Sequence, residues 1–387
     1  MKPVKKLLIV QTSNSMLGGA LGATVPLLMK ARGISPEQIG LIASLNPAIF
    51  QSTRVLIASV SDMVGRVPFL GLTGVLSALT LGVYYTARSK VQFATGTLLD
   101  SLRGSALWAV NRPFVLEHTE EARGSLVGMI GMTMIFSSLG SLVAGIISAR
   151  FSLDTTLLFF LPLSLTALIT TLTMRDRVQR KKVSFKAIFS DLNPLKRSKR
   201  FQKLIASYIL AGFAVGTLLS YVMPLFYSSK GLTPSQVGIA LSIQSMTAGT
   251  LAYFVTTRFS SAKFLSFAGI IYFSSLLLLA LSPLPPFILP IFAGIAASIF
   301  HGTNETLLSI FPEEGSYGAD VALLMLGLHS GNTIAQAYAG FVIASVGFFP
   351  VFLISASAFL TFSIIAYVLS RRCIKALENR EKSSSEC

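Results

Sequence analysis

Long apolar stretches with few charges dominate this sequence of 387 residues. Hydrophobic residues make up 52% of the chain and charged residues only 12%, about half the share found in soluble proteins. A helix needs about 20 mostly apolar residues to cross the hydrocarbon core of a bilayer, and only a helix satisfies its own backbone hydrogen bonds there. Twelve segments qualify. The predicted spans are residues 6–29, 36–60, 67–87, 91–114, 122–149, 154–174, 202–227, 234–257, 263–282, 285–311, 318–346 and 349–370.

The distribution of Lys and Arg predicts the orientation of these spans. With the N-terminus inside, the inner loops and tails hold 24 basic residues and the outer loops only six. Because basic residues accumulate on the cytoplasmic side, both termini are predicted to be cytoplasmic in a multi-pass protein of the cell membrane. The net charge of +16 then reflects topology and contact with anionic lipid, and nucleic-acid binding is not expected.

Other sequence features argue against several classes of protein. Cys373 and Cys387 both lie in the polar C-terminal tail, so no disulfide framework or cysteine-based metal site is expected. No GxxxxGK[ST] loop is present, so ATP is not the evident energy source. The N-terminal lysines precede an apolar stretch as in a signal peptide, but polar residues 11–14 interrupt it, and we expect a retained first span.

The chain contains an internal repeat. A shift of 198 residues aligns PLLMKARGISPEQIG (26–40) with PLFYSSKGLTPSQVG (224–238), with six of fifteen positions identical, and also aligns RGSAL (103–107) with HGTNE (301–305). Each copy of the first pair turns at a glycine and restarts with a Ser or Thr N-cap, a proline and a glutamine. A shift of 195 aligns Ala144-Gly145 with Ala339-Gly340. We therefore predict an all-α transmembrane fold of twelve helices in two six-helix bundles related by a parallel repeat.

The repeat also predicts how the chain is divided. We expect an N-terminal bundle at 1–174, a basic cytoplasmic linker at 175–200, a C-terminal bundle at 201–371 and a cytoplasmic tail at 372–387. In the linker, Phe185, Ile188, Phe189 and Leu192 follow helical spacing, which predicts an amphipathic helix on the inner leaflet.

A loop motif carries a resemblance to a known family. Between the second and third predicted spans the sequence reads ASVSDMVGRV, in which Asp62, Gly65 and Arg66 match the pattern of this loop in the major facilitator superfamily, while three other positions depart from it. With the two six-span repeats and the basic central loop, the resemblance covers essentially the whole chain. It implies alternating access, with Asp62, Gly65 and Arg66 as gating residues and Arg66 pairing with Glu117 or Glu120.

The fifth predicted span matches a second pattern of that family only in part. The antiporter-associated pattern of Gly-Pro, two residues and Gly-Gly reads GSLVAG here, so Gly140 and Gly145 match but Ser141 and Ala144 do not. This weakens the case for drug/proton antiport. Small residues also allow helices to pack closely.

Polar residues within the spans predict a solute cavity. In the family that this chain resembles, spans 1, 4, 7 and 10, and often 11, line the cavity. Polar residues at helical spacing in those spans share one face, which in lipid should face protein or water. The predicted cavity residues are Gln11, Asn14, Arg103, His301, Asn304, His329 and Asn332. The repeat makes Arg103 and His301 equivalent, so we expect them to face one another near mid-membrane.

Two carboxyl groups in these spans are candidate proton carriers. Glu305 lies one turn from His301, and Asp100 precedes Arg103 by three residues. A carboxylate that alternates between an arginine partner and a desolvated setting changes its proton affinity, which can couple proton movement to rocking of the halves. Asp100 could instead be only the structural partner of Arg103, so Glu305 is the preferred carrier.

These features together predict a secondary active transporter for a small organic solute, coupled to protons or another cation. We expect a monomer surrounded by membrane lipids, with no catalytic residue, metal or cofactor. Export of amphipathic compounds is the preferred direction, because 28 phenylalanines and eleven methionines suit adaptable apolar walls. A sugar or organic-anion permease is the alternative, and a polytopic membrane enzyme is a distant one.

Overall fold

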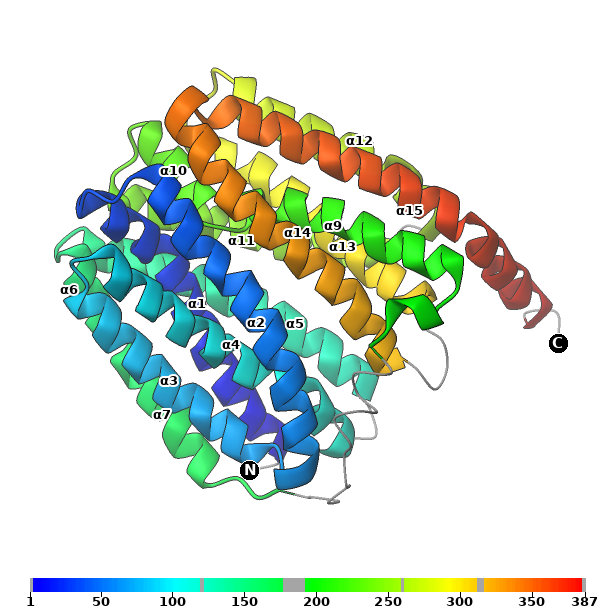
Figure 1. Ribbon diagram of the computed structural model, residues 1–387, viewed down its shortest axis with the longest axis horizontal. Helices are drawn as coiled ribbons and strands as arrows, with labels where there is room; N and C mark the ends of the chain where they lie inside the picture. The colour runs from blue at the N-terminus through cyan, green and yellow to red at the C-terminus, as the bar shows by residue number, and fades with distance from the viewer. Residues whose placement is uncertain (1–2, 119–121, 177–191, 259–260, 312–316, 385–387) are drawn as a thin grey trace.

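The computed structural model describes residues 3–118, 122–176, 192–258, 261–311 and 317–384, and these ranges are almost entirely helical (Figure 1). The N-half consists of α1 (Pro3–Ala31), α2 (Pro36–Val64), α3 (Val67–Thr86), α4 (Lys90–His118), α5 (Ala122–Ser148), α6 (Leu153–Leu158) and α7 (Leu161–Leu172). The C-half consists of α9 (Lys199–Leu218), α10 (Val222–Ser229), α11 (Pro234–Arg258), α12 (Ser261–Leu281), α13 (Leu289–Ile310), α14 (Tyr317–Val346) and α15 (Phe348–Ser384), preceded by the 3₁₀ turn η1 (Pro194–Lys196). These described helices confirm the twelve predicted spans.

Two of the twelve spans are broken rather than continuous. The sixth is divided into α6 and α7, and the seventh into α9 and α10. Pro162 and Pro224 each lie just after a break. Proline lacks the N–H that would bond four residues back, and its ring crowds that carbonyl. Pro26, the repeat partner of Pro224, stays inside the continuous α1, so the seventh span differs from its counterpart despite the shared residue.

The repeated turn predicted at the glycines is confirmed. Gly33 and Gly231 have φ angles of +76° and +86°, a region that glycine enters without the Cβ penalty of other residues. Thr233 and Gln236 form the predicted reciprocal cap, since the Gln236 side chain accepts from the Thr233 amide at 2.9 Å. Ser35 occupies the N-cap position of the first copy but makes no side-chain cap bond.

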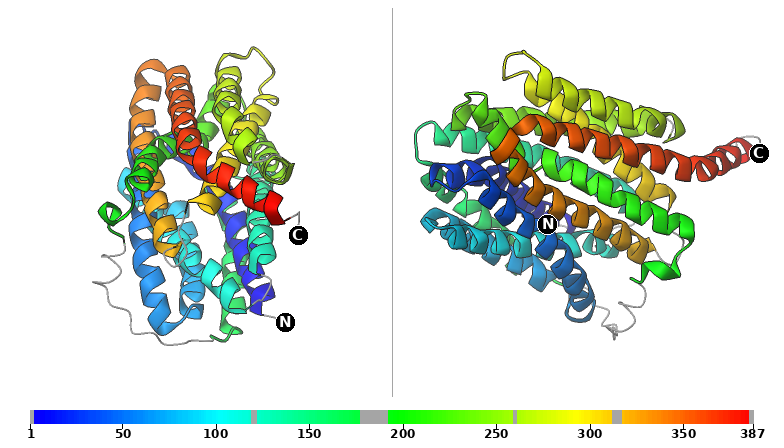
Figure 2. Two further views of the ribbon diagram at one scale, coloured as in Figure 1. Left: turned by 90° about the vertical axis from the view of Figure 1, so that its right-hand side faces the viewer. Right: turned by 45° about the horizontal axis from the view of Figure 1, so that its top comes forward.

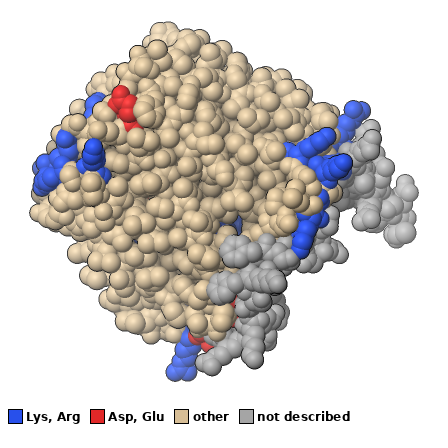
Figure 3. All heavy atoms as spheres, viewed as in Figure 1, with Lys and Arg blue, Asp and Glu red and all other residues tan. Residues whose placement is uncertain are grey.

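Both chain ends lie on one side of the bundle, here called the termini side (Figure 1). The opposite side carries the α1–α2 turn and α10. A space-filling view shows charged side chains near the two ends of the bundle and a broad surface between them with almost no Lys, Arg, Asp or Glu (Figure 3). Such a belt fits contact with lipid hydrocarbon.

Hydropathy separates the apolar spans from the more polar ones. Among the described residues, eight spans are long and apolar enough to cross a membrane on composition alone. The remaining membrane-length helices are α1, α4, α13 and α14, and they carry all seven of the predicted cavity residues. Polar residues are tolerated at membrane depth where they face protein or a cavity instead of lipid.

The two halves meet along two pairs of helices, α2 with α14 and α5 with α11, which Figure 2 shows from two further directions. Glycines make both contacts close. A Cβ on Gly340 of α14 would lie 3.0 Å from Gly40 Cα of α2, and a Cβ on Gly145 of α5 would lie 3.1 Å from Gly238 Cα of α11. Both pairs lie toward the opposite side, where Lys30 Nζ of the N-half also donates to Ser228 Oγ of the C-half at 2.9 Å.

The partial GSLVAG motif is explained by this packing. A methyl group on Gly140 would overlap the carbonyl oxygen of Met16 on α1, and Ser141 Oγ donates to the carbonyl of Gly19 on α1 at 3.0 Å. Gly145 faces α11 instead. Each small residue therefore has a packing role that needs no antiport chemistry.

The linker prediction falls mostly outside the described residues. The expected amphipathic helix covers 185–192, of which the structure describes only Leu192. The ends of the linker are fixed to the two halves: Asp176 Oδ2 accepts from the Val67 amide at the start of α3 at 2.9 Å, and Arg197 Nε donates to Asp320 Oδ1 of α14 at 2.6 Å. The predicted tail continues α15 as a helix to Ser384.

Candidate substrate cavity

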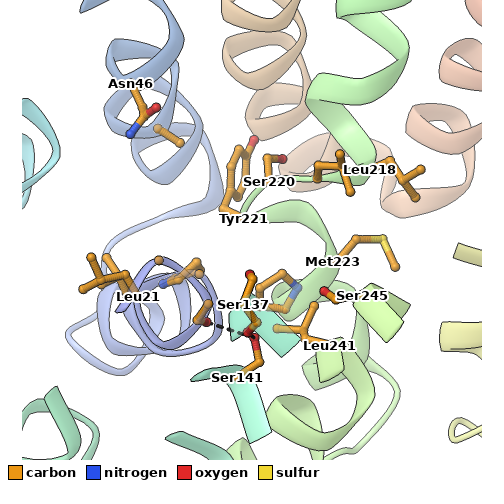
Figure 4. A pocket seen from close by; sticks show the side chains of 18 of the residues that line it. Leu21, Asn46, Ser137, Ser141, Leu218, Ser220, Tyr221, Met223, Leu241 and Ser245 are labelled. Carbon is orange, nitrogen blue, oxygen red and sulfur yellow. Dashed lines mark hydrogen bonds between the residues drawn. The ribbon is translucent and has the colours of Figure 1, made fainter. Parts of the chain in front are cut away.

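A central cavity of about 600 Å³ lies between the two halves. The N-half lines it with α1, α2, α4 and α5 and with Tyr84 of α3. The C-half lines it with the break between α9 and α10 together with α11, α13 and α14. Figure 4 shows Ser137 and Ser141 of the N-half near Leu241 and Ser245 of the C-half, with Tyr221 and Ser220 at the broken span. Leaving residues 219–221 non-helical gives this wall an irregular backbone, which membrane proteins tolerate where it borders a cavity.

A second cavity of about 250 Å³ adjoins the first within the N-half. Arg103 lines it, and its side chain is only 7% exposed. The guanidinium forms an ion pair with Asp100 Oδ1 at 2.6 Å and donates to the side chain of Asn14. Asn46 Nδ2 donates to the other Asp100 oxygen at 3.3 Å. Arg103 is therefore neutralised and held by α1 and α4, while α2 holds its carboxylate partner.

His301 lines the central cavity, whereas Arg103 lines only the smaller one. The prediction that these two repeat-equivalent residues face one another directly across the cavity is therefore wrong. The reason is local: Asp100 and Asn14 hold the Arg103 guanidinium against the N-half. Asp100, the ion-pair partner of that guanidinium, lines both cavities.

Gln11 lies in a packed hydrogen-bond network and lines neither cavity. Its side chain donates to Thr133 Oγ1 at 3.0 Å and accepts from Asn111 Nδ2 at 3.2 Å, and both Gln11 and Asn111 are fully buried. These contacts tie α1, α4 and α5 together. The network satisfies the polar atoms of Gln11, as burial requires.

Three predicted residues of the C-half lie beside the central cavity without lining it. Asn332 Oδ1 accepts from Gln336 Nε2 at 2.7 Å, and Gln336 itself lines the cavity. His329 packs against Phe50 of α2 with ring centroids 5.1 Å apart, at the contact between the halves. Asn304 donates to Glu305 Oε1 at 3.4 Å.

Of the two candidate proton carriers, Glu305 is the less engaged. It lines the central cavity, is exposed to it, and has no basic side chain within ion-pair distance in the described part of the chain. Asp100, by contrast, is tied to Arg103 and Asn46. The two candidate proton carriers therefore differ in their freedom to exchange partners.

Trp108 and Arg112 of α4 are among the cavity residues that sequence reasoning missed. Both line the central cavity. Arg112 lies near the inner end of its predicted span, and α4 continues past it to His118. Their spacing of four residues places both on one helix face, a signal that the sequence already contained.

The residues predicted to form the gate lie on the termini side. Gly65 ends α2 with a φ of +106°, and its amide donates to the Ser61 carbonyl at 3.0 Å. Arg66, with a side chain only 10% exposed, contacts Asp62 and pairs with Glu117 Oε1 at 3.1 Å. This is one of the two pairings that the sequence predicts for Arg66. All these partners belong to the N-half, and the gating role itself stays a prediction.

On the opposite side, Asp154 at the start of α6 joins two neighbouring turns. Its Oδ2 pairs with Arg32 at 2.5 Å and with Arg88 at 3.5 Å. The Ser152 hydroxyl and the Thr155 amide both donate to its Oδ1. With these two bonds and the two arginines, Asp154 clamps this end of the N-half.

The described residues include no group of three or more His, Cys, Asp or Glu side chains that could hold a metal ion. Separate side chains therefore supply the chemistry of the cavity: Arg103, which is neutralised by Asp100, Arg112, which has no ion pair among the described residues, and the Glu305 carboxylate. Such an arrangement can bind and release charged or polar solutes and protons.

Twelve spans arranged as two repeated halves around a central cavity define a class of protein: a multi-pass membrane protein with the fold of a secondary transporter. The family model of the Major Facilitator Superfamily matches residues 7–285. The chain therefore belongs to this superfamily. No curated protein matches the sequence.

Solved structures with the same fold cover nearly the whole chain. The nucleoside transporter NupG is 16% identical with a TM-score of 0.75, covering 95% of this chain and 99% of that one. The human organic anion transporter MFSD10 (TETRAN) is 15% identical with a TM-score of 0.71, covering 94% and 98%. A bacterial homolog of the human lysosomal transporter Spinster, in an inward-facing and unoccupied conformation, is 15% identical with a TM-score of 0.71, covering 96% and 97%.

Proposed function

We propose that this protein moves a small organic solute across the cell membrane by proton-coupled alternating access, and that Glu305 carries the proton. The observation behind this proposal is the setting of Glu305: a carboxylate of the C-half that lines the cavity between the halves and has no ion-pair partner in the ranges described. A carboxylate at membrane depth is costly when ionised and unpaired, so its protonation can change as its surroundings change.

The contacts between the halves support alternating access. The closest backbone approaches, Gly40 with Gly340 and Gly145 with Gly238, lie toward the opposite side. The predicted gate ion pair of Arg66 and Glu117 stays within one half. If the termini are cytoplasmic, as the basic residues predict, this conformation is closed to the exterior. Rocking of the two halves about the α2–α14 and α5–α11 contacts would then open the opposite side and close the termini side.

Asp100 is better suited to a fixed structural role. Its ion pair with Arg103 and its bond from Asn46 satisfy both carboxylate oxygens. Protonating Asp100 would leave the buried Arg103 guanidinium without a carboxylate, which is unfavourable. Within the described residues, the one side-chain bond that Glu305 would lose is the weak bond from Asn304.

We propose export of amphipathic compounds, because the apolar part of the lining suits such solutes. Its wall includes Leu21, Met29, Met223 and Leu241. Flexible methionine and leucine side chains adapt to solutes of different shapes. A permease for an organic anion is the second candidate, and Arg112 favours it. The fold does not choose between the two, since the similar structures include a nucleoside transporter and an organic anion transporter.

The test is flux in proteoliposomes that contain a trapped pH-sensitive dye. A panel of sugars, organic anions and amphipathic cations is applied with and without an imposed pH gradient, and with a sodium gradient as a second coupling ion. For the solute that moves, we expect proton flux to accompany solute flux. Glu305→Gln should abolish proton flux and gradient-driven accumulation, while solute exchange between equal compartments continues.

Glu37→Gln is the matched control, because Glu37 lies at the start of α2 on the opposite side, outside the cavity. It should leave coupling unchanged. Full proton-coupled accumulation by Glu305→Gln would exclude Glu305 as the carrier, and accumulation driven only by sodium would exclude proton coupling.

A further inference from the structure

We propose that Trp108 and Arg112 of α4 form a binding subsite for an anionic organic solute, in which Arg112 holds a carboxylate or phosphate and Trp108 packs against the attached apolar or aromatic body. This inference deepens the proposed function by naming a solute class. It rests on the same cavity, but it can be tested by binding alone, without transport or proton movement.

The two side chains share one face of α4. Residues four apart are neighbours on a helix surface, so the indole and the guanidinium lie about one turn from each other. Both line the central cavity, and Trp108 also lines the smaller cavity that adjoins it. A flat apolar surface beside a forked cation suits a solute with a ring or chain at one end and an acid group at the other.

Arg112 differs from Arg103 and Arg66 in lacking a counter-charge within the described residues. Arg103 pairs with Asp100 and Arg66 with Asp62 and Glu117, whereas no carboxylate lies within 4.0 Å of Arg112 in the described ranges. The Arg112 Nε atom is also buried without a hydrogen-bond partner. A partly buried guanidinium without a partner is unfavourable. An anion that enters the cavity would supply the hydrogen-bond acceptor that the Arg112 guanidinium lacks.

A second arginine adds positive charge near the same wall. Arg54 of α2 packs its guanidinium over the Phe50 ring at 5.9 Å and also has no ion pair within the described segments. The charges of Arg54 and Arg112 repel one another. Two uncompensated arginines at this depth make the N-half wall attractive to anions.

On the facing half, Glu305 carries the opposite charge to Arg112. It lines the same cavity and would attract a cationic solute and repel an anionic one. The solute class therefore depends on which charge dominates. We assign the anion because Arg112 has the buried unpaired donor, whereas Glu305 is exposed and retains the contact from Asn304.

The chain contains one tryptophan, so tryptophan fluorescence reports on this subsite alone. The purified full-length protein is titrated in lipid nanodiscs with three quenchers of the same shape: 4-nitrobenzoate, neutral 4-nitrobenzamide and cationic 4-nitrobenzylamine. A charge-assisted bidentate bond should make the half-saturating concentration of the benzoate about tenfold lower than that of the amide. Phenyl phosphate, and not phenol, should displace the benzoate.

Variants separate the role of each side chain. Arg112→Gln should bring benzoate and amide to equal affinity, and Arg112→Lys should keep part of the difference because it keeps the charge. Arg150→Gln, which removes an exposed arginine outside the cavity, should change nothing. Trp108→Phe gives the fluorescence blank.

Equal binding of benzoate and amide by the wild-type protein would overturn the proposal, as would tightest binding of the amine or an undiminished preference in Arg112→Gln. Loss of coupling in the proton assay would not affect these outcomes. A failure of the anion subsite is therefore distinguishable from a failure of the proposed function.

Discussion

The glycine contacts between the halves make a sharp prediction for Gly340→Ala. A Cβ at this position would lie 2.6 Å from the Pro36 carbonyl oxygen and 3.0 Å from Gly40 Cα, both backbone atoms of α2. Since ordinary contact begins at about 3.4 Å, α2 and α14 would have to separate by several tenths of an ångström. Overpacking of this kind costs about 1–3 kcal/mol.

The cost falls mainly on the conformation in which α2 and α14 touch at this level. A destabilisation of about 1–3 kcal/mol of one state corresponds to a roughly 5- to 150-fold shift toward the alternative state. We therefore expect Gly340→Ala to favour the state open on the opposite side. Net transport should slow, because the cycle must pass through the destabilised closure.

The assay is labelling of a single cysteine by an impermeant maleimide. Cys373 and Cys387 are first replaced by serine, and Met29→Cys provides a reporter that lines the cavity near the end of α1. Labelling from the opposite side should rise within the range above in Gly340→Ala. Gly82→Ala is the control, because nothing lies within 4 Å of a Cβ at that position. An unchanged labelling rate in Gly340→Ala, or the same increase in Gly82→Ala, would refute the reasoning.

Two further predictions concern ion pairs. Asp100→Asn should lower the free energy of unfolding by about 3–5 kcal/mol, because it leaves the buried Arg103 guanidinium without its carboxylate. In chemical unfolding, the double variant with Arg103→Gln should recover part of that loss. Strictly additive effects of the two substitutions would show that the pair is not coupled. Asp154 pairs with Arg32 and Arg88, so Asp154→Asn removes the attraction to both arginines and should destabilise this end of the N-half. Melting curves at pH 7 should therefore show wild type more stable than Asp154→Asn, and equal melting temperatures of the two proteins would contradict the clamp.

Much of the fold follows from patterns that are local in sequence. The apolar segments set the spans, and the glycine turn at Gly33 and Gly231 needs only the conformational freedom of glycine. The pair of Asp100 and Arg103 is also local, since i, i+3 spacing on a helix places the two charges together. Such features depend on little beyond the helix that contains them.

The positions of cavity residues depend on how helices far apart in sequence rotate and pack. Gln11 has the polarity of a lining residue, but α4 and α5 bring Asn111 and Thr133 to it and turn it into a packing residue. Arg112 lies near the inner end of its predicted span, where a basic residue is expected, but the packing of α4 places it in the cavity wall. Neither outcome can be read from one helix, because each is decided by its neighbours.

The internal repeat explains why the scaffold is symmetric while the cavity is not. Gly40 and Gly238 occupy equivalent repeat positions, as do Gly145 and Gly340, and each contact between the halves joins one member of each pair. Close backbone approach is needed at both contacts, so both copies keep glycine. The cavity positions need not carry the same residue in both copies. The repeat equivalent of Arg103 is His301, and that of Leu107 is Glu305. Charge can therefore differ between the walls, with Arg103 and Arg112 on the N-half and Glu305 on the C-half. A solute with one charged end would then bind in a defined orientation between the two walls.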